Sequence, residues 1–276
     1  MNRSTPARPA FSTSRRAALV TTLLGAIAVT TALVPVLMPS PALAASVQGS
    51  GNSATEMRTL DAFDAVALSG AMDLVVRQGA QQSVQVQADD NLLPLLETLV
   101  ESGRNGTTLK VRWKREGGMG SWGGWGGSSN YIQTRTKVLI TVVVPKLSAV
   151  SVAGSGDVRV ESFSTPSLQL SLAGSGDARL DGLTTDELAV RVSGSGDVTG
   201  KGTAAKVKIS IAGSGDVRLS DMRADDVSVS IAGSGDAAVN AQKSLSVSIA
   251  GSGDVSYTGD AQVKSSVAGS GSVRRK

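Results

Sequence analysis

The second half of the chain repeats the motif Gly-Ser-Gly-Asp at an almost constant interval. Six copies and one Gly-Ser-Gly-Ser variant begin at Gly154, Gly174, Gly194, Gly213, Gly233, Gly251 and Gly269, which gives units of 18 to 20 residues. A unit of this length cannot bury an apolar face alone, so neighbouring units must stack to form a core. The repeat therefore restricts the chain to a solenoid.

Apolar and polar residues alternate on both sides of the motif. One apolar column before it consists of Val152, Leu172, Val192, Ile211, Ile231, Ile249 and Val267, and a second, two residues earlier, of Val150, Leu170, Val190, Ile209, Val229 and Val247. The column between them is Ser151, Ser171, Arg191, Ser210, Ser230, Ser248 and Ser266. After the motif the apolar column is Val158, Ala178, Val198, Val217, Ala237, Val255 and Val273. A period of two is typical of β-strands.

Each unit is therefore predicted to be a strand, a tight glycine turn and a second strand. A chain that reverses within four residues usually needs a positive φ, which glycine adopts without a Cβ clash. Polar segments at 164–167, 184–186 and 223–226 should form the outer corners, where the strands end. With one circuit per repeat, the sequence predicts an all-β, single-domain parallel β-helix.

Residues 1–44 have the pattern of a signal peptide. Arg15 and Arg16 precede an uncharged stretch over 17–38, and Ala42 and Ala44 form a small-x-small cleavage site. A membrane anchor is disfavoured because threonines dilute the apolar run and prolines break it. The arginine pair also resembles a twin-arginine signal, so the export route stays open between Sec and twin-arginine.

After this segment we predict a flexible leader over 45–57 and one β-helical domain over 58–276. Removing four leader arginines leaves 27 − 4 = 23 basic residues against 23 acidic residues, so net charge does not favour nucleic-acid binding. The chain has no Cys and no His, which excludes disulfides, His-based triads and most zinc sites. We predict no catalytic residue, no cofactor and no membrane span after cleavage, and a periplasmic or extracellular, cell-surface location.

The N-terminal half contains a degenerate version of the repeat. Residues 69–73, Ser-Gly-Ala-Met-Asp, should form the turn of a first coil. Further strands are expected at 84–88, 109–113 and 138–144. The leucine-rich segment 89–97 is expected to form one or two helical turns, with Asp90 or Asn91 as the N-cap and Pro94 in the first turn.

A glycine-rich segment over 117–131 separates two of these strands. One interpretation is a mobile hairpin loop; the other is a ligand-contact tip formed by Trp122, Trp125 and Tyr131, because aromatic side chains are frequent at interfaces and rare in this chain. Trp113 lies in an alternating strand and is predicted to pack in the core.

The order of these motifs resembles the GIN-domain family, described as putative auto-transporter adhesin heads. The resemblance rests on 63–66 (Phe-Asp-Ala-Val), 68–70 (Leu-Ser-Gly), 92–96 (Leu-Leu-Pro-Leu-Leu), 142–145 (Val-Val-Val-Pro) and the serial Gly-Ser-Gly-Asp motif. It covers nearly all of the chain after residue 60. The resemblance implies an exported, β-helical domain without enzymatic activity.

The repeated aspartate is the principal candidate for chemistry. Stacking would align Asp157, Asp177, Asp197, Asp216, Asp236 and Asp254 about 4.8 Å apart, where like charges repel by about 1 kcal/mol per neighbour in bulk water. One interpretation is structural: each carboxylate caps N–H groups of its own glycine turn and pairs with the arginine two residues later, at Arg159, Arg179 and Arg218. The other is bound Ca²⁺, for which Asp197, Asp236 and Asp254, lacking that arginine, are the candidates.

Three classes of function are compatible with this pattern. The first is an adhesin-like or scaffold module that binds a cell-envelope protein or a glycan. The second is a Ca²⁺-dependent enzyme acting on polysaccharide, since paired carboxylates on a β-helix can cleave sugars. The third is a periplasmic sensing module that binds a partner.

Overall fold

The computed structural model describes residues 46–103, 106–114 and 132–276. The predicted signal peptide and the three aromatic residues Trp122, Trp125 and Tyr131 lie outside these residues. Within the described ranges, no helix has the length and apolar character needed to cross a membrane.

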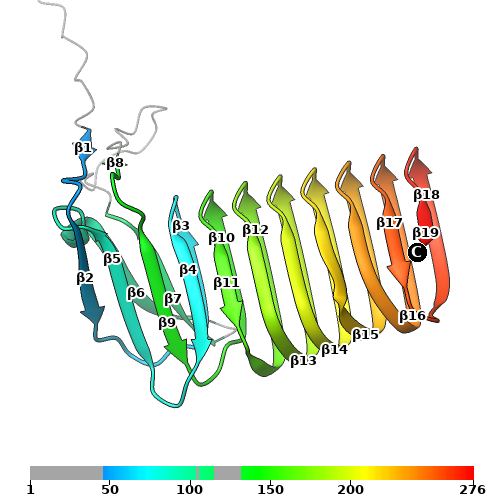
Figure 1. The fold of residues 1–276 in the computed structure, drawn as a ribbon, viewed down its shortest axis with the longest axis horizontal. Coiled ribbons are helices and arrows are strands. Elements are labelled where there is room, and N and C mark those ends of the chain that lie inside the picture. Colours follow the sequence, from blue (N-terminus) through cyan, green and yellow to red (C-terminus); the bar gives the residue numbers. More distant parts are fainter. Residues whose placement is uncertain (1–45, 104–105, 115–131) are drawn as a thin grey trace, which may run out of the picture. The chain divides into compact units, whose positions relative to one another are not determined.

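The repeats form a stack of parallel coils, which confirms the predicted β-helix (Figure 1). The first glycine of each motif pairs with the first glycine of the next coil, from Gly154 to Gly269. The strands of the repeats are β10 (Ala149–Gly154), β11 (Val158–Glu161), β12 (Ser164–Gly174), β13 (Ala178–Gly194), β14 (Val198–Gly213), β15 (Val217–Gly233), β16 (Ala237–Gly251), β17 (Val255–Thr258), β18 (Gln262–Gly269) and β19 (Val273–Arg275). The glycine turns lie along the upper edge of the stack in Figure 1.

A degenerate first coil precedes these repeats, as predicted. It consists of β3 (Ala65–Ser69) and β4 (Asp73–Gln78), which pair in parallel with β10 and β11. The turn between them therefore occupies the place of a Gly-Ser-Gly-Asp turn.

The predicted corners do not end the strands. Strands β13 to β16 run through them, because corner residues keep parallel partners in the neighbouring coils, as Thr184 does with Ser164. Thr185 is buried, and its hydroxyl donates to the carbonyls of Pro166 and Glu187 at 3.2 and 3.1 Å. The pairing of β13 to β16 shifts register between residues 181 and 183, 199 and 201, 219 and 223, and 224 and 226. All of these positions follow a glycine turn and precede or lie in the corner, so this part of the coil absorbs the variation in repeat length.

The predicted apolar columns form the core. Their members from Val150 to Ile249 and from Val158 to Val255 are at most 4% exposed. The serine column between them faces outward. The predicted alternation of inward apolar and outward polar side chains is therefore confirmed. Trp113, predicted as core, is partly buried and packs against the cluster.

Both glycine columns are required by the stacking of the turns. The first glycine has a positive φ in every motif, for example 132° at Gly174. The second glycine does not; instead, a Cβ on Gly196 would lie 2.1 Å from the carbonyl oxygen of Gly176 in the previous coil. The second column therefore allows the backbones to approach, whereas the first also allows the chain to reverse.

An antiparallel cap covers the first coil. It is built from β2 (Ser53–Arg58), β5 (Ser83–Asp89), β6 (Leu96–Gly103), β7 (Gly106–Trp113) and β9 (Leu139–Val144). Strand β7 pairs in parallel with β3, and β9 pairs in parallel with β4. On the β3 side, β6 pairs antiparallel with β7. On the β4 side, β5 pairs antiparallel with β9, and β2 pairs antiparallel with β5. Two short strands, β1 (Val47–Gln48) and β8 (Ile132–Gln133), pair beside it.

Two expectations for this region are corrected. The leader expected to be flexible over 45–57 contains β1 and most of β2, because β8 pairs with β1 and the edge of β5 pairs with β2. The expected helix is a single 3₁₀ turn, η1 (Leu93–Leu95), with Pro94 in its first turn but without a side-chain cap. Asn91 does not cap it, because its side chain binds the backbone of Ser50 and Gln48.

Candidate functional site: the aspartate ladder and the post-turn face

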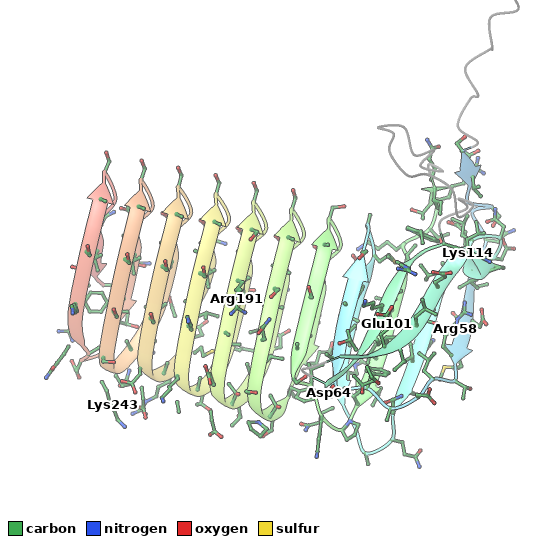
Figure 2. The ribbon with its side chains drawn as sticks, turned by 180° about the vertical axis from the view of Figure 1, so that it is seen from behind. Arg58, Asp64, Glu101, Lys114, Arg191 and Lys243 are labelled. Carbon is green, nitrogen blue, oxygen red and sulfur yellow. The ribbon has the colours of Figure 1, made fainter. Side chains whose placement is uncertain are left out.

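The coils present two outer faces with different chemistry. The pre-turn face, formed by the strand segments before the glycine turns, carries the serine column and Arg191 (Figure 2). The post-turn face, formed by the segments after the turns, carries the aspartates and a neighbouring column that contains Arg159, Arg179, Thr199 and Arg218. The candidate site lies on the post-turn face.

The aspartates join successive coils. In each of them Oδ1 accepts a hydrogen bond from the backbone N–H at the same position of the next coil, at 2.8 to 3.1 Å. The series starts at Asp73 and continues through Asp157, Asp177, Asp197, Asp216, Asp236 and Asp254 to the N–H of Ser272. We call this series the aspartate ladder.

The expectation that each carboxylate caps its own turn is therefore corrected. The ladder bond crosses 18 to 20 residues of sequence within the repeats. The N–H donors of the turn are satisfied across coils as well: the N–H of Ser175, for example, donates to the carbonyl of Gly154 at 3.0 Å. Each carboxylate thus stabilises the contact between two coils rather than the shape of one turn.

The predicted arginine partners are confirmed only at Arg218. Its guanidinium donates to Oδ2 of Asp216 at 2.7 Å and to Oδ2 of Asp197, one coil earlier, at 2.9 Å. Arg159 instead pairs with Asp181 in the next coil at 3.0 Å. Arg179 forms no ion pair or hydrogen bond with any residue that the structure describes.

Two of the three Ca²⁺ candidates have cationic partners that the sequence analysis did not assign. Asp197 pairs with Arg218, and Asp254 pairs with Arg274 at 2.7 Å. For Asp236 no ion pair occurs among the described residues. The described ranges contain no group of three or more acidic side chains placed to hold a metal ion.

The pKa values of two ladder carboxyls are lowered. Burial alone would raise the pKa of Asp197, but the N–H of Asp216 and the guanidinium of Arg218 lower it below its ordinary value. The pKa of Asp254 is lowered by the hydroxyl and the N–H of Ser272 and by Arg274. These carboxyls are therefore held in the charged form, as acceptors.

A shallow groove of about 430 Å³ runs across the post-turn face over β4, β11, β13, β14 and β15. Its polar lining is Asp73, Asp157, Asp177, Asp197, Arg159, Arg179, Arg218 and Thr199. Val75 and Leu139 contribute apolar side chains at the cap end. Two further hollows share Arg218 with it. One continues along the stack to Arg274 and Arg275, and the other extends toward the corner over Asp181, Lys201 and Asp221.

A buried carboxylate lies in the cap. Asp89 is 0% exposed; Oδ1 accepts from the N–H of Gly51 at 2.9 Å, and Oδ2 accepts from the N–H groups of Arg135 and Thr136 at 3.0 and 3.2 Å. Burial alone would raise the pKa of Asp89, and these backbone donors lower it. Gly49 passes so close that a Cβ would lie 2.3 Å from Oδ2. Asp89 therefore ties the N-terminal segment to the cap.

Sequence analysis missed several members of the site. Asp73 belongs to the ladder, and the alignment of its Ser-Gly-Ala-Met-Asp turn with the repeats would have identified it. Lys137, which pairs with Asp73 at 2.9 Å, and Asp181, which pairs with Arg159, carry no comparable signal because their partners are distant in sequence.

Comparison with known proteins gives one family and several solved structures. The family model "Putative auto-transporter adhesin, head GIN domain" matches residues 62–261. A putative adhesin from Bacteroides fragilis has 24% sequence identity and a TM-score of 0.72, covering 84% of this chain and 100% of that one. A putative adhesin from Parabacteroides merdae has 22% identity and a TM-score of 0.62, with coverage of 84% and 100%.

A third similar structure has a different description. It is a putative lipid binding protein from Parabacteroides distasonis, with 26% identity, a TM-score of 0.68 and coverage of 84% of this chain and 99% of that one. No curated protein matches the chain in sequence.

Proposed function

Since the chain belongs to the family of putative auto-transporter adhesin head GIN domains, we propose that it is an exported, non-catalytic binding module of the cell envelope. Residues 1–44 direct its export and are removed, and the mature chain acts in the periplasm or at the cell surface. The observation that carries this proposal is the use of the repeated carboxylates as links between coils. Groups engaged in this way provide a rigid surface rather than a reactive centre.

The chemistry of the ladder supports a non-catalytic role. Glycoside cleavage needs two carboxyl groups in different environments, one of them with a raised pKa so that it can act as an acid. The ladder carboxyls repeat the same contact in every coil, and the two with resolved shifts have lowered pKa values. The chain also has no histidine to act as a general base.

Binding is proposed on the outer faces. The inward columns of the described coils are filled by packed apolar side chains, so the coil interior does not favour the entry of an acyl chain. We therefore do not propose a lipid site in this chain, although the similar Parabacteroides distasonis structure is described as a putative lipid binding protein. A regular outer face formed by the stacked parallel strands is suited to a partner that contacts several coils at once.

Two measurements test the proposal. The mature chain, incubated with pectic, alginate and peptidoglycan substrates, should show no turnover. Used as bait against envelope extract and a glycan array, it should retain a defined set of proteins or glycans. Turnover that is lost when a ladder aspartate is replaced would refute the non-catalytic role. Retention of nothing in either format would refute the binding role.

A further inference from the structure

The centre of the groove contains polar groups that the fold itself leaves without partners. Oδ1 of Asp157 and of Asp177 is engaged in the ladder. For Oδ2 of both residues, no hydrogen bond or ion pair occurs within the described ranges, and the same holds for the guanidinium of Arg179. All three side chains are exposed and line the same groove.

The ends of the groove differ from this centre. At the cap end, Oδ2 of Asp73 is paired with Lys137 at 2.9 Å. On the other side, Arg218 bridges Asp197 and Asp216. Arg179 stands in the same relation to Asp157 and Asp177 as Arg218 does to that pair, yet its bridge is not formed. Among the coils that line this groove, these two therefore keep a carboxylate oxygen and a guanidinium without a partner in the described ranges.

The free groups define the chemistry of a ligand. A carboxylate only accepts hydrogen bonds and a guanidinium only donates them, whereas a hydroxyl group does both. The groove lining contains four aspartates and three arginines, a net charge of 3 − 4 = −1. This near balance does not favour a polyanion or a polycation, since steering of a charged partner needs an excess of one sign. The apolar side chains of Val75 and Leu139 offer contact to C–H groups.

The shape of the groove favours a linear ligand. The hollow is open, and the adjoining hollow lined by Asp216, Asp236 and Asp254 extends it toward β19 along the same column of residues. Successive coils repeat about every 4.8 Å, so a polymer of similar units would meet similar groups. We propose that the post-turn groove binds an uncharged polysaccharide, with Arg179, Asp157 and Asp177 forming its central hydrogen bonds. This inference rests on the proposed binding function and specifies its ligand.

Affinity gel electrophoresis of the full chain tests the proposal, with dextran, galactomannan or xyloglucan in the gel and alginate as the acidic comparison. We expect at least one neutral polymer to retard the protein. Arg179→Gln should weaken this retardation about tenfold, the effect of losing one charge-assisted hydrogen bond. Arg191→Gln is the matched control, because Arg191 is equally exposed on β13 but lies on the pre-turn face (Figure 2).

Asp177→Asn provides a second variant that keeps an oxygen for the ladder bond, and it should weaken retardation without a change in melting temperature. Equal retardation of Arg179→Gln and Arg191→Gln would overturn the location. Retardation by alginate alone would overturn the ligand class. If no polysaccharide retards the chain but an envelope protein is retained through Arg179, the glycan inference fails while the binding function stands; if nothing binds, both fail.

Discussion

Replacing Gly196 by alanine should force two coils apart. A Cβ at this position would lie 2.1 Å from the carbonyl oxygen of Gly176 and 3.1 Å from its carbonyl carbon. Non-bonded heavy atoms prefer separations of about 3.5 Å, so the backbones must move by more than about 1 Å. Gly196 does not have a positive φ, and the effect therefore measures close approach alone.

The loss of stability follows from the hydrogen bonds around this contact. Ser195 N–H donates to the carbonyl of Gly174 at 2.9 Å, and Asp197 N–H donates to Oδ1 of Asp177 at 3.0 Å. Ala178 N–H donates to the carbonyl of Asp197 at 2.8 Å. Each bond contributes about 0.5–1.5 kcal/mol net, so breaking all three lowers the free energy of unfolding by about 1.5–4.5 kcal/mol. Overpacking of a well-packed site costs a similar amount.

Urea denaturation measures this change, with midpoints compared at equal slope. The matched control is Ser195→Ala, because Ser195 is the exposed neighbour in the same turn; its effect should stay within about 0.5 kcal/mol. If Gly196→Ala and Ser195→Ala unfold at the same midpoint, close stacking of the turns is not what the second glycine column provides.

Three further predictions address the core, acid stability and metal binding. Ile231→Asp should abolish the cooperative melt, because Ile231 is 1% exposed and an unpaired buried charge costs several kcal/mol; Ser230→Asp on the outer face should melt normally, and equal behaviour of the two would contradict the register. The lowered pKa of Asp254 adds stability that is present above the unfolded pKa of about 4 and is lost as the pH falls through the folded pKa. The melting temperature of Asp254→Asn should therefore decline less between about pH 7 and pH 2 than that of the unchanged protein. Parallel curves of melting temperature against pH would rule this out. Millimolar Ca²⁺ should barely change the melting temperature relative to EDTA, because Oδ1 of each ladder aspartate already accepts a backbone N–H and the described residues contain no cluster of three acidic side chains placed to hold a metal; a shift of many degrees would instead show a bound cation.

The alternation of the repeats was sufficient to predict the coil. Whether a residue such as Ile231 or Ser230 faces inward depends on its neighbours two positions away, and that information is local. The glycine turn is local as well, because reversal of the chain within four residues determines the φ angle that is needed. These features therefore followed from the sequence without knowledge of the stack.

The partners of the charged groups could not be predicted in the same way. Turn chemistry suggested that an aspartate binds its own turn, but the available N–H of Asp197 lies next to Asp177 only after the coils stack. An arginine side chain is long enough to reach one coil forward or back, as Arg159 and Arg218 show in opposite directions. Strand β2 escaped detection for a related reason: its residues are polar, Met57 is 61% exposed, and its strand conformation depends on pairing with β5.

The confinement of register irregularities to one half of the coil has a consequence for evolution and for engineering. Gain or loss of one or two residues is absorbed between the glycine turn and the end of the corner, while the turns themselves stay aligned. The edge formed by the corners therefore tolerates insertions and deletions better than the edge formed by the glycine turns. A peptide inserted at the corner beside Lys243, which is exposed and paired only with Asp225 of the previous coil among the described residues (Figure 2), would be displayed outward while the ladder keeps its spacing. Short loops of varied sequence could thus accumulate along the corner edge while the glycine turns and the aspartate ladder stay unchanged.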